Sequence, residues 1–118
     1  NGKVYFLSFP VERNLANTQG AFEENATPYW KLVYSRIAAR QIASRAIEKS
    51  SPLLGVTEHQ LENGSKIAII INYSPSAIKS GAVLKPEWSI KHVLYGKMEK
   101  GEFSVPANDA LIIEISKS

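Results

Sequence analysis

The sequence contains no cysteine and only two histidines among its 118 residues. The absence of cysteine excludes a disulfide framework and thiolate metal sites, and it leaves the cellular compartment open. The longest uninterrupted apolar run, Ile67–Ile71, is far shorter than the ~20 residues that a membrane-spanning helix needs, so we expect no membrane partner. The chain is also too short for a (β/α)₈ barrel, which takes about 250 residues.

Motifs that carry common enzyme chemistry are absent as well. The sequence has no Gly-x-Ser-x-Gly elbow, no Gly-x-x-x-x-Gly-Lys phosphate loop and no dinucleotide-binding Gly-x-Gly-x-x-Gly. His59 and His92 fall in separate predicted strands without metal-ligand spacing. A glycosidase needs two carboxylates at the scissile bond, and nothing in the sequence brings Glu12 and Glu58 together. The sequence thus predicts no catalytic residue, no cofactor and no metal.

The composition is that of a globular domain with a modest basic excess. Hydrophobic residues make up 44% of the chain, which is enough to build a packed core. The net charge is +3, and the densest basic stretch (Lys31, Arg36, Arg40 and Arg45) falls within one predicted helix. This helix face is solvated, packed against another domain, or a contact surface for an anionic partner. No DNA- or RNA-binding motif accompanies it, so we expect no nucleic-acid partner.

The N-terminal part of the chain is predicted to form a strand, a loop and a helix. Residues 4–9 are apolar on both faces, which is typical of a strand buried in a parallel α/β sheet. Residues 13–27 have the Asn, Thr and Gly content of a loop. Thr27-Pro28 then offers a cap and a first-turn proline, and apolar residues recur at helical spacing until Ser50-Ser51-Pro52 ends the pattern. We expect a helix over residues 28–49.

After this helix the period of the apolar pattern changes to two, which is typical of strands. Asn63-Gly64 is a strong hairpin signal, because both central positions of such a turn need a positive φ. Short strands with turn residues between them predict an antiparallel β-sandwich, Greek-key-like, over residues 52–118. The predicted fold class is therefore mainly β, with one N-terminal α-helix and an extra N-terminal strand. The expected strands are residues 54–61, 66–73, 78–84, 88–95, 102–105 and 110–115.

Two of these strands contain more isoleucine than a half-buried strand requires. Ile70 in one strand and Ile112 in the other fall on the side that we expect to face solvent. We therefore expect a neighbour, either the helix at residues 28–49 or another domain, to cover that side. The residues expected to face the core are Ile67, Ile69, Ile71 and Tyr73 in one strand and Leu111, Ile113 and Ile115 in the other.

Aromatic rings exposed on a sheet can stack on sugar rings, and the later predicted strands contain aromatic residues. Trp88 shares a face with Ile90 and Leu94 on period-two counting, which favours a core position. Tyr95 falls on the opposite face. Trp88 and Tyr95 are the candidates for a sugar platform, and an exposed row of planar rings would favour a carbohydrate-binding module.

Five stretches of the chain are similar to parts of a known family. They are Gly2–Glu12, Pro28–Leu32, Glu62–Ser74, Trp88–Gly96 and Val105–Ile115. Together they resemble the late part of β-galactosidase-type glycoside hydrolases. The first two are similar to a strand and a helix of the amidotransferase-like domain that follows the catalytic barrel. The other three are similar to strands of the C-terminal all-β domain, including a strand that ends in Asn-Tyr-Ser.

The resemblance implies that residues 1–51 are a strand-loop-helix remnant of the preceding α/β domain and that residues 52–118 are the C-terminal β-sandwich domain. The catalytic carboxylates of this family lie on the barrel, which the chain lacks, so the implied role is that of a non-catalytic accessory domain. Its implied partner is the catalytic domain of the same polypeptide, which it would stabilise. Such packing would also explain a doubly buried first strand and a covered Ile70.

Two other functions stay open at this point. One is a carbohydrate-binding module, with carbohydrate as the partner and exposed aromatic rings as the platform. The other is an interaction module that uses the basic helix to bind acidic partners. The apolar strand at residues 4–9, if left unpaired, would also allow a homodimer through an exposed strand edge.

Overall fold

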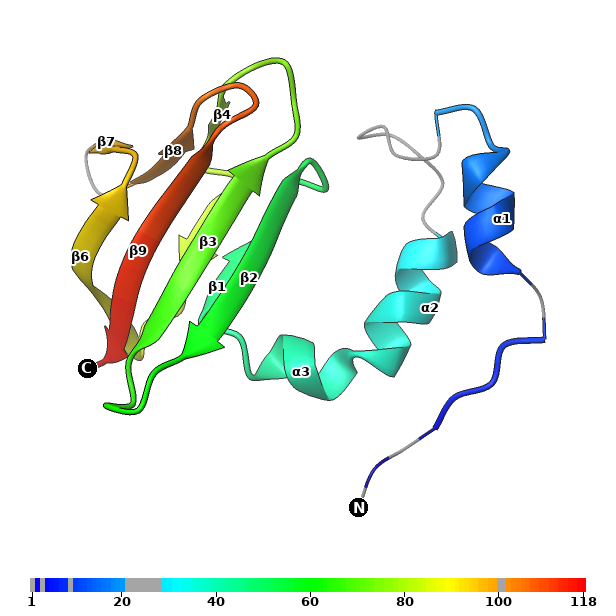
Figure 1. Cartoon of the computed structure of the whole chain (residues 1–118), viewed down its shortest axis with the longest axis horizontal. Helices are drawn as coiled ribbons and strands as arrows, with labels where there is room; N and C mark the ends of the chain where they lie inside the picture. The colour runs from blue at the N-terminus through cyan, green and yellow to red at the C-terminus, as the bar shows by residue number, and fades with distance from the viewer. Residues whose placement is uncertain (1, 3, 9, 21–28, 100–101) are drawn as a thin grey trace. The chain divides into compact units, whose positions relative to one another are not determined.

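The computed structural model of the chain describes residues 2, 4–8, 10–20, 29–99 and 102–118. It is mainly β, as predicted, with 43% strand and 16% helix. The chain divides into two compact units, Asn1–Ser44 and Arg45–Ser118. The first unit holds the three helices of the described residues and the second holds their nine strands (Figure 1).

The first unit begins with a helix that the sequence did not indicate. The three helices are α1 (Val11–Ala16), α2 (Tyr29–Ile37) and α3 (Ala39–Ala43). The loop prediction is therefore wrong where it overlaps α1. The polar residues that indicated a loop instead close the helix: the Asn17 amide donates to the Arg13 carbonyl at 2.8 Å, and the Thr18 hydroxyl donates to the Asn14 carbonyl at 2.6 Å. The Thr18 bond satisfies a carbonyl at the end of the helix, and the Asn17 side chain adds a second bond to the Arg13 carbonyl, which also accepts the Asn17 N–H at 3.2 Å.

The predicted N-terminal strand is wrong over residues 4–8, which form no regular secondary structure. Val4 and Phe6 are almost fully exposed. A strand is stabilised by pairing with a neighbour, and none of the described strands pairs with these residues. Phe9, the last residue of the prediction, lies outside the described residues.

The predicted helix over residues 28–49 is wrong after Ala43. It is interrupted at Ala38, between α2 and α3, and it ends at Ala43. Strand β1 (Ile47–Lys49) follows and pairs with β5 (Ala82–Leu84). Because Ile47 is buried in the core of the second unit, tertiary burial outweighs the helical pattern here. The predicted start at Thr27-Pro28 lies outside the described residues.

Four strands of the second unit form an antiparallel sheet. Their order is β2-β3-β9-β6, so the last strand of the chain lies between β3 and β6 (Figure 1). The predicted hairpin is confirmed by the pairing of β2 with β3, and Asn63 Oδ1 accepts the N–H of Ser65 at 3.0 Å. Of its two central positions only Gly64 has a positive φ, 82°, so the expected positive φ at Asn63 is wrong. The strands are β2 (Leu54–Gln60), β3 (Lys66–Asn72), β6 (Trp88–Tyr95) and β9 (Ala110–Lys117).

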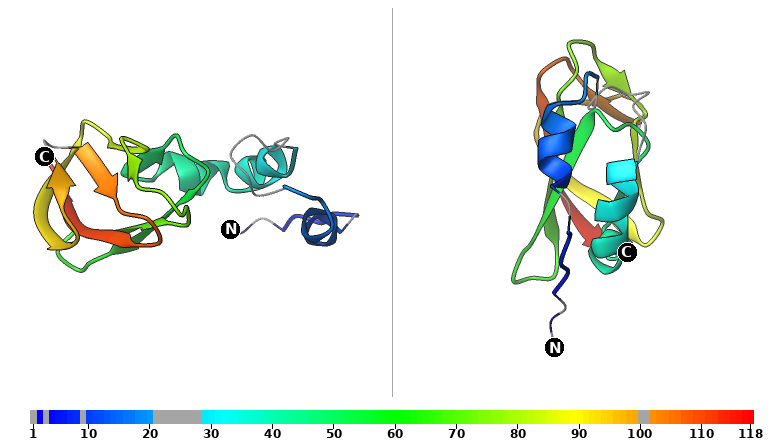
Figure 2. Two further views of the ribbon diagram at one scale, coloured as in Figure 1. Left: turned by 90° about the horizontal axis from the view of Figure 1, so that it is seen from above. Right: turned by 90° about the vertical axis from the view of Figure 1, so that its right-hand side faces the viewer.

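Two smaller sheets form the second layer. One is β1-β5, and the other has the order β4-β8-β7, with β4 (Ile78–Lys79), β7 (Met98–Glu99) and β8 (Glu102–Val105). The strand predicted over residues 78–84 is thus two strands, which separate at Ser80, whose φ is 54°. In Figure 1 the four-stranded sheet lies in front of these strands, and the view from above in Figure 2 shows them arranged around one interior.

The two layers enclose a core of apolar side chains. Each sheet contributes residues to it, with Leu54, Val56 and Ile70 on one side and Phe103 and Val105 on the other. The core members with no exposed surface are Ala46, Ala68, Ile70, Val105, Leu111, Ile113 and Ile115.

The two faces of β3 are assigned in the opposite way from the prediction. Ile70 is fully buried, whereas Ile69 lies on the outer face and is partly exposed. Period-two alternation fixes which residues share a face but not which face is buried. Here the neighbours decide, because Val56 and Leu111, which lie opposite Ile70 on β2 and β9, are both buried. The outer residues of β3 are Ile67, Ile69 and Ile71.

The prediction for β9 is confirmed. Leu111, Ile113 and Ile115 have no exposed surface, and Ile112 lies on the outer face and is partly exposed. Since Ile112 pairs with Ile69, the outer face of the sheet carries isoleucines side by side on its two central strands.

Candidate functional site

Trp88, one of the two predicted sugar-platform residues, lies in the core. It is 8% exposed and packs among the buried apolar residues of the sandwich, which confirms its predicted core position. Lys66 Nζ lies 4.6 Å and Lys117 Nζ 5.8 Å from the ring centroid, which are distances of cation–π attraction. Leu94, expected on the same face, is exposed, because the register of β6 shifts twice after Ile90.

Tyr95, the other predicted platform residue, lies at the surface. Its side chain is 52% exposed, on the outer face of the sheet. The hydroxyl donates a hydrogen bond to Asp109 Oδ1 at 3.0 Å. This hydrogen bond, together with the negative charge of Asp109, raises the pKa of the Tyr95 phenol. The ring is therefore fixed in direction while much of it stays open to solvent.

A second exposed tyrosine, Tyr73, lies on the same face, so the prediction that it faces the core is wrong. Tyr73 follows β3 and is 64% exposed. A Cβ atom built at Gly55, on the neighbouring strand β2, would lie 2.8 Å from Cε2 and from the hydroxyl of Tyr73. The ring thus lies against the glycine backbone, where any side chain would collide with it. Glycine within a strand often marks such a close approach, and that was the available sequence signal.

Tyr73 lines a hollow at the end of the outer face where β3 ends and β9 begins, and Tyr95 is joined to this hollow through its hydrogen bond to Asp109. The hollow has a volume of about 400 Å³, within the usual range for small-molecule sites. Its lining is both apolar and polar. The lining residues are Ile71, Asn72, Tyr73, Asn108, Asp109 and Ala110.

A buried amide holds the turns that form this hollow. Asn72 is 1% exposed, and its Nδ2 lies within hydrogen-bond distance of the carbonyls of Ser76 (2.8 Å), Pro106 (2.9 Å) and Val105 (3.1 Å). Its Oδ1 accepts the N–H of Ser74 at 2.8 Å. Two turns from distant parts of the sequence are therefore joined by one side chain.

Two polar side chains are presented at the rim of the hollow. Asn108 has a φ of 50°, a left-handed conformation that Asn tolerates well, and its N–H donates to the Ser74 carbonyl at 3.0 Å. Asp109 Oδ1 accepts the N–H of Ala110 at 2.7 Å as well as the Tyr95 hydroxyl. Within the described residues, Asp109 Oδ2 and the side-chain amide of Asn108 make no hydrogen bond, so both are available to a ligand.

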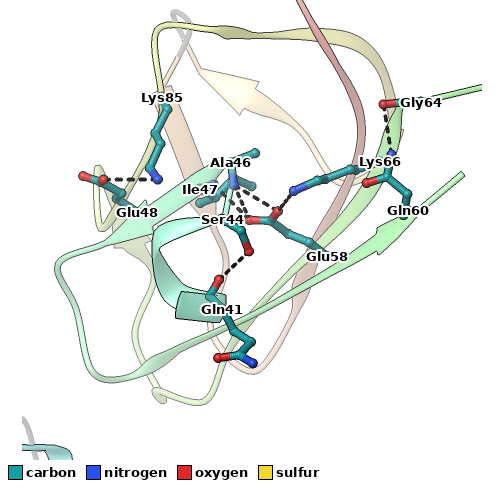
Figure 3. Close-up of polar contacts among 10 residues, drawn as sticks. All are labelled: Gln41, Ser44, Ala46, Ile47, Glu48, Glu58, Gln60, Gly64, Lys66 and Lys85. Atoms are coloured by element: carbon teal, nitrogen blue, oxygen red, sulfur yellow. Dashed lines mark hydrogen bonds and ion pairs between the residues drawn. The ribbon is translucent and has the colours of Figure 1, made fainter. Parts of the chain in front are cut away.

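A second polar cluster, shown in Figure 3, closes one end of the core. Glu58 accepts the N–H of Ala46 at 2.8 Å and 2.9 Å, one distance for each carboxylate oxygen, and the N–H of Ile47 at 3.0 Å. Lys66 Nζ lies 2.7 Å from the same carboxylate. These bonds fix the start of β1 on β2.

The electrostatics of this cluster are those of a structural ion pair. Burial by itself raises the pKa of Glu58, but the hydrogen bond from Lys66, the amides of Ala46 and Ile47 and the charge of Lys66 outweigh it, so the pKa lies below its ordinary value. A carboxylate held ionised in this way is a poor proton donor at neutral pH. Glu58 therefore has a structural role.

Glu12, the other carboxylate considered for catalysis, lies in the first unit at the surface. It accepts a hydrogen bond from the Tyr34 hydroxyl, which joins α1 to α2. That bond lowers the pKa of Glu12 and raises the pKa of Tyr34. The structure thus gives Glu12 and Glu58 separate local partners in separate units.

The basic residues of the predicted helix are distributed over three segments. Arg36 lies in the last turn of α2, Arg40 lies in α3, and Arg45 precedes β1. Arg36 and Arg40 line a hollow of about 640 Å³ in the first unit, together with Tyr5. The break at Ala38 separates the two arginines that the prediction placed on one continuous helix.

Neither histidine has the surroundings of a metal ligand. His59 and His92 are exposed, and the described residues contain no group of three or more His, Cys, Asp or Glu side chains placed to hold a metal ion. No helix within these residues is both long and apolar enough to cross a membrane.

Comparisons with protein families, curated proteins and solved structures found no match to this chain.

Proposed function

We propose that the chain is a non-catalytic accessory region of a β-galactosidase-type glycoside hydrolase and that its β-sandwich unit is a contact module. The sequence resemblance of five stretches to that family supports the assignment. The local structural roles of Glu58 and Glu12 support a non-catalytic part. The observation on which the proposal depends most is an apolar band on the outer face of the four-stranded sheet, which consists of Ile67, Ile69 and Ile112.

The apolar band lies on the two central strands of the sheet. Ile69 pairs with Ile112 across β3 and β9, and Ile67 is the next outward residue of β3. The second layer of the sandwich packs on the opposite face, through residues such as Phe103 and Val105. The band is therefore left partly exposed within this unit. Contiguous apolar surface of this kind is typical of a site that contacts another protein.

In this proposal the partner is the catalytic part of the same polypeptide. Burial of the apolar band would add free energy of stabilisation to both parts, since a surface that is exposed in the separate unit is removed from water. The accessory region would then raise the thermal stability of the catalytic part without touching its substrate.

The test uses the longer polypeptide in which this chain follows a catalytic domain. Replacing both Ile69 and Ile112 by Lys should lower the melting temperature of the catalytic domain and shorten the lifetime of activity on heating. Val83→Lys is the matched control, because Val83 is an exposed apolar residue on β5 in the other layer. Circular dichroism of the separate 118-residue chain with the same double change should show a retained fold. Unchanged melting and lifetime in the double variant would contradict the proposal.

A further inference from the structure

The hollow lined by Tyr73, Asn108 and Asp109, with Tyr95 hydrogen-bonded to Asp109, has the features of a ligand site on the contact face of the proposed accessory module. It lies beside the apolar band but consists of other residues, with Ile71 and Ala110 as its floor. The geometry points to a binding site for a neutral oligosaccharide, with Tyr73 and Tyr95 as stacking platforms and Asn108 and Asp109 as partners of the sugar hydroxyls. The inference rests on the proposed function only in placing both surfaces on one face.

Tyr73 is built as a platform. Its ring lies against the backbone of Gly55, where a Cβ would approach it to 2.8 Å, and yet its side chain is 64% exposed. One side of the ring is thus supported by the sheet, and the surface that remains is free for contact. The face of an aromatic ring carries partial negative charge, which attracts the positively polarised C–H bonds of a pyranose ring.

Tyr95 supplies a second aromatic surface at a set distance. It lies on β6 and Tyr73 follows β3, with β9 between these strands. Neighbouring strands are about 4.8 Å apart, so the two strands are separated by about 10 Å across the sheet. Tyr95 is also displaced along β9 from Tyr73, because it pairs with Ile112 whereas Tyr73 lies beyond the Ile71–Ala110 pair. A span of that length suits a chain of linked sugar rings that crosses the strands rather than a single ring. The hydrogen bond to Asp109 orients Tyr95 before any ligand arrives.

Polar groups at the hollow match the hydroxyls of a sugar. Asp109 Oδ2 is an acceptor, and the Asn108 amide offers a donor and an acceptor, with no other hydrogen bond to either group within the described residues. The negative charge of Asp109 disfavours phosphorylated or carboxylated ligands, which makes a neutral saccharide the preferred class. The turn that presents both groups is held by the buried Asn72, so little ordering is required on binding.

The experiment uses the full 118-residue chain and native gels that contain soluble β-linked galactan, glucan, mannan or xylan, with polygalacturonate as the charged comparison. The wild-type chain should be retarded by at least one neutral polymer and less by polygalacturonate. Calorimetry with the matching hexasaccharide then gives the affinity. Tyr73→Ala and Tyr95→Ala should each weaken it about five- to tenfold, the loss of one aromatic contact.

Three further variants separate a platform from a general surface effect. Gly55→Ala should weaken binding about as much as Tyr73→Ala, because it displaces the ring without removing a ligand contact. Tyr73→Phe should stay near the wild-type affinity. Tyr34→Ala removes an exposed tyrosine of the first unit and should leave binding unchanged.

Two results would overturn the inference. One is a folded wild-type chain that is retarded by none of the neutral polymers. The other is retardation that survives the combined Tyr73→Ala and Tyr95→Ala change. Ile69→Lys lies outside the hollow and should keep glycan binding, so a failure of the proposed packing and a failure of the saccharide site give different results.

Discussion

The two faces of the four-stranded sheet are similar in sequence and different in surroundings. The inner face carries Ile70 and Ile113, which have no exposed surface, and the outer face carries Ile69 and Ile112, which are partly exposed. The second layer covers only the inner face. Residues that follow one another in β3 thus belong to two environments. A strand that is apolar on both sides has two apolar surfaces that can be buried, and the fold of this unit buries one of them.

The largest difference between the two faces should appear on truncation of isoleucine. Ile70→Ala should lower the free energy of unfolding by about 3–4 kcal/mol, because it removes buried methyl groups and leaves a cavity. Ile69→Ala should lower it by about 1 kcal/mol, because its side chain already meets solvent. Urea denaturation of the two variants measures both values. An equal or larger loss for Ile69→Ala would mean that the faces are reversed.

The next effect concerns the buried amide under the hollow of the outer face. Asn72→Ala should lower the free energy of unfolding by about 2–3 kcal/mol, because the N–H of Ser74 and the carbonyls near Asn72 Nδ2 lose a buried partner. The same change should loosen the turn at Asn108. Hydrogen exchange of the Asn108 amide, which donates to Ser74, is the local readout. Protection equal to that of the wild type would show that the turn holds without Asn72.

A smaller effect, which depends on pH, is expected at the ion pair that closes the inner face. Glu58→Gln should lower the free energy of unfolding at neutral pH by about 1–2 kcal/mol, allowing for screening by solvent. The pKa of Glu58 is lower in the folded than in the unfolded chain. Its contribution is therefore fully present above the unfolded pKa of about 4.3 and is lost as the pH falls through the folded pKa.

The lowered pKa of Glu58 in the folded chain can be tested by measuring stability as a function of pH. The difference in unfolding free energy between the wild type and Glu58→Gln should be constant between pH 7 and about pH 6, well above the unfolded pKa, and should shrink as the pH falls toward 3. Urea denaturation at each pH supplies the values, and Glu62→Gln, on the exposed hairpin, is the control. A difference that does not change toward pH 3 would contradict the assigned charge state.

The smallest effect lies on the outer face and involves no unfolding. The hydrogen bond to Asp109 and its charge raise the pKa of Tyr95. Asp109→Asn should therefore let one of the five tyrosines ionise at a lower pH, which ultraviolet absorbance records in an alkaline titration. Tyr95→Phe should remove that step from the curve. Identical titration curves for the wild type and Asp109→Asn would exclude the hydrogen bond.

The sequence predicted the parts of the fold that depend on local chemistry. The hairpin at Asn63-Gly64 is present, although only Gly64, and not Asn63, has the positive φ on which the prediction was based. The inward residues of β9 and the core position of Trp88 follow from alternation along one strand. These features require no knowledge of the partner strand.

Features that depend on a partner were missed or assigned wrongly. β1 exists because β5 pairs with it, although its residues continue a helical pattern. Residues 4–8 have a strand-like sequence and no partner, and they form no strand. The buried side of β3 was assigned in reverse. Alternation along β3 shows which residues share a face, but the buried face is decided by Val56 and Leu111, which lie beside Ile70 on the neighbouring strands.

The candidate site was predicted only in part for the same reason. Tyr95 was singled out, but its contact with Asp109 depends on the register shifts of β6. Tyr73 lies over Gly55, and that approach requires the pairing of β2 with β3. Trp88 was a candidate sugar platform because it is a large aromatic residue, but its position in the sheet places it in the core.

The position of β9 has a consequence for how the protein is made. The ribosome delivers β2, β3 and β6 first, yet β3 and β6 become neighbours of a common strand only when residues 110–117 have emerged. Until then the β2-β3 hairpin has an open edge and an uncovered inner face, which is the state in which nascent β-proteins associate with one another. Slow decoding before β9 would prolong this state, and a chaperone that shields the β3 edge would shorten the exposure. Formation of the four-stranded sheet thus requires the eight-residue strand β9.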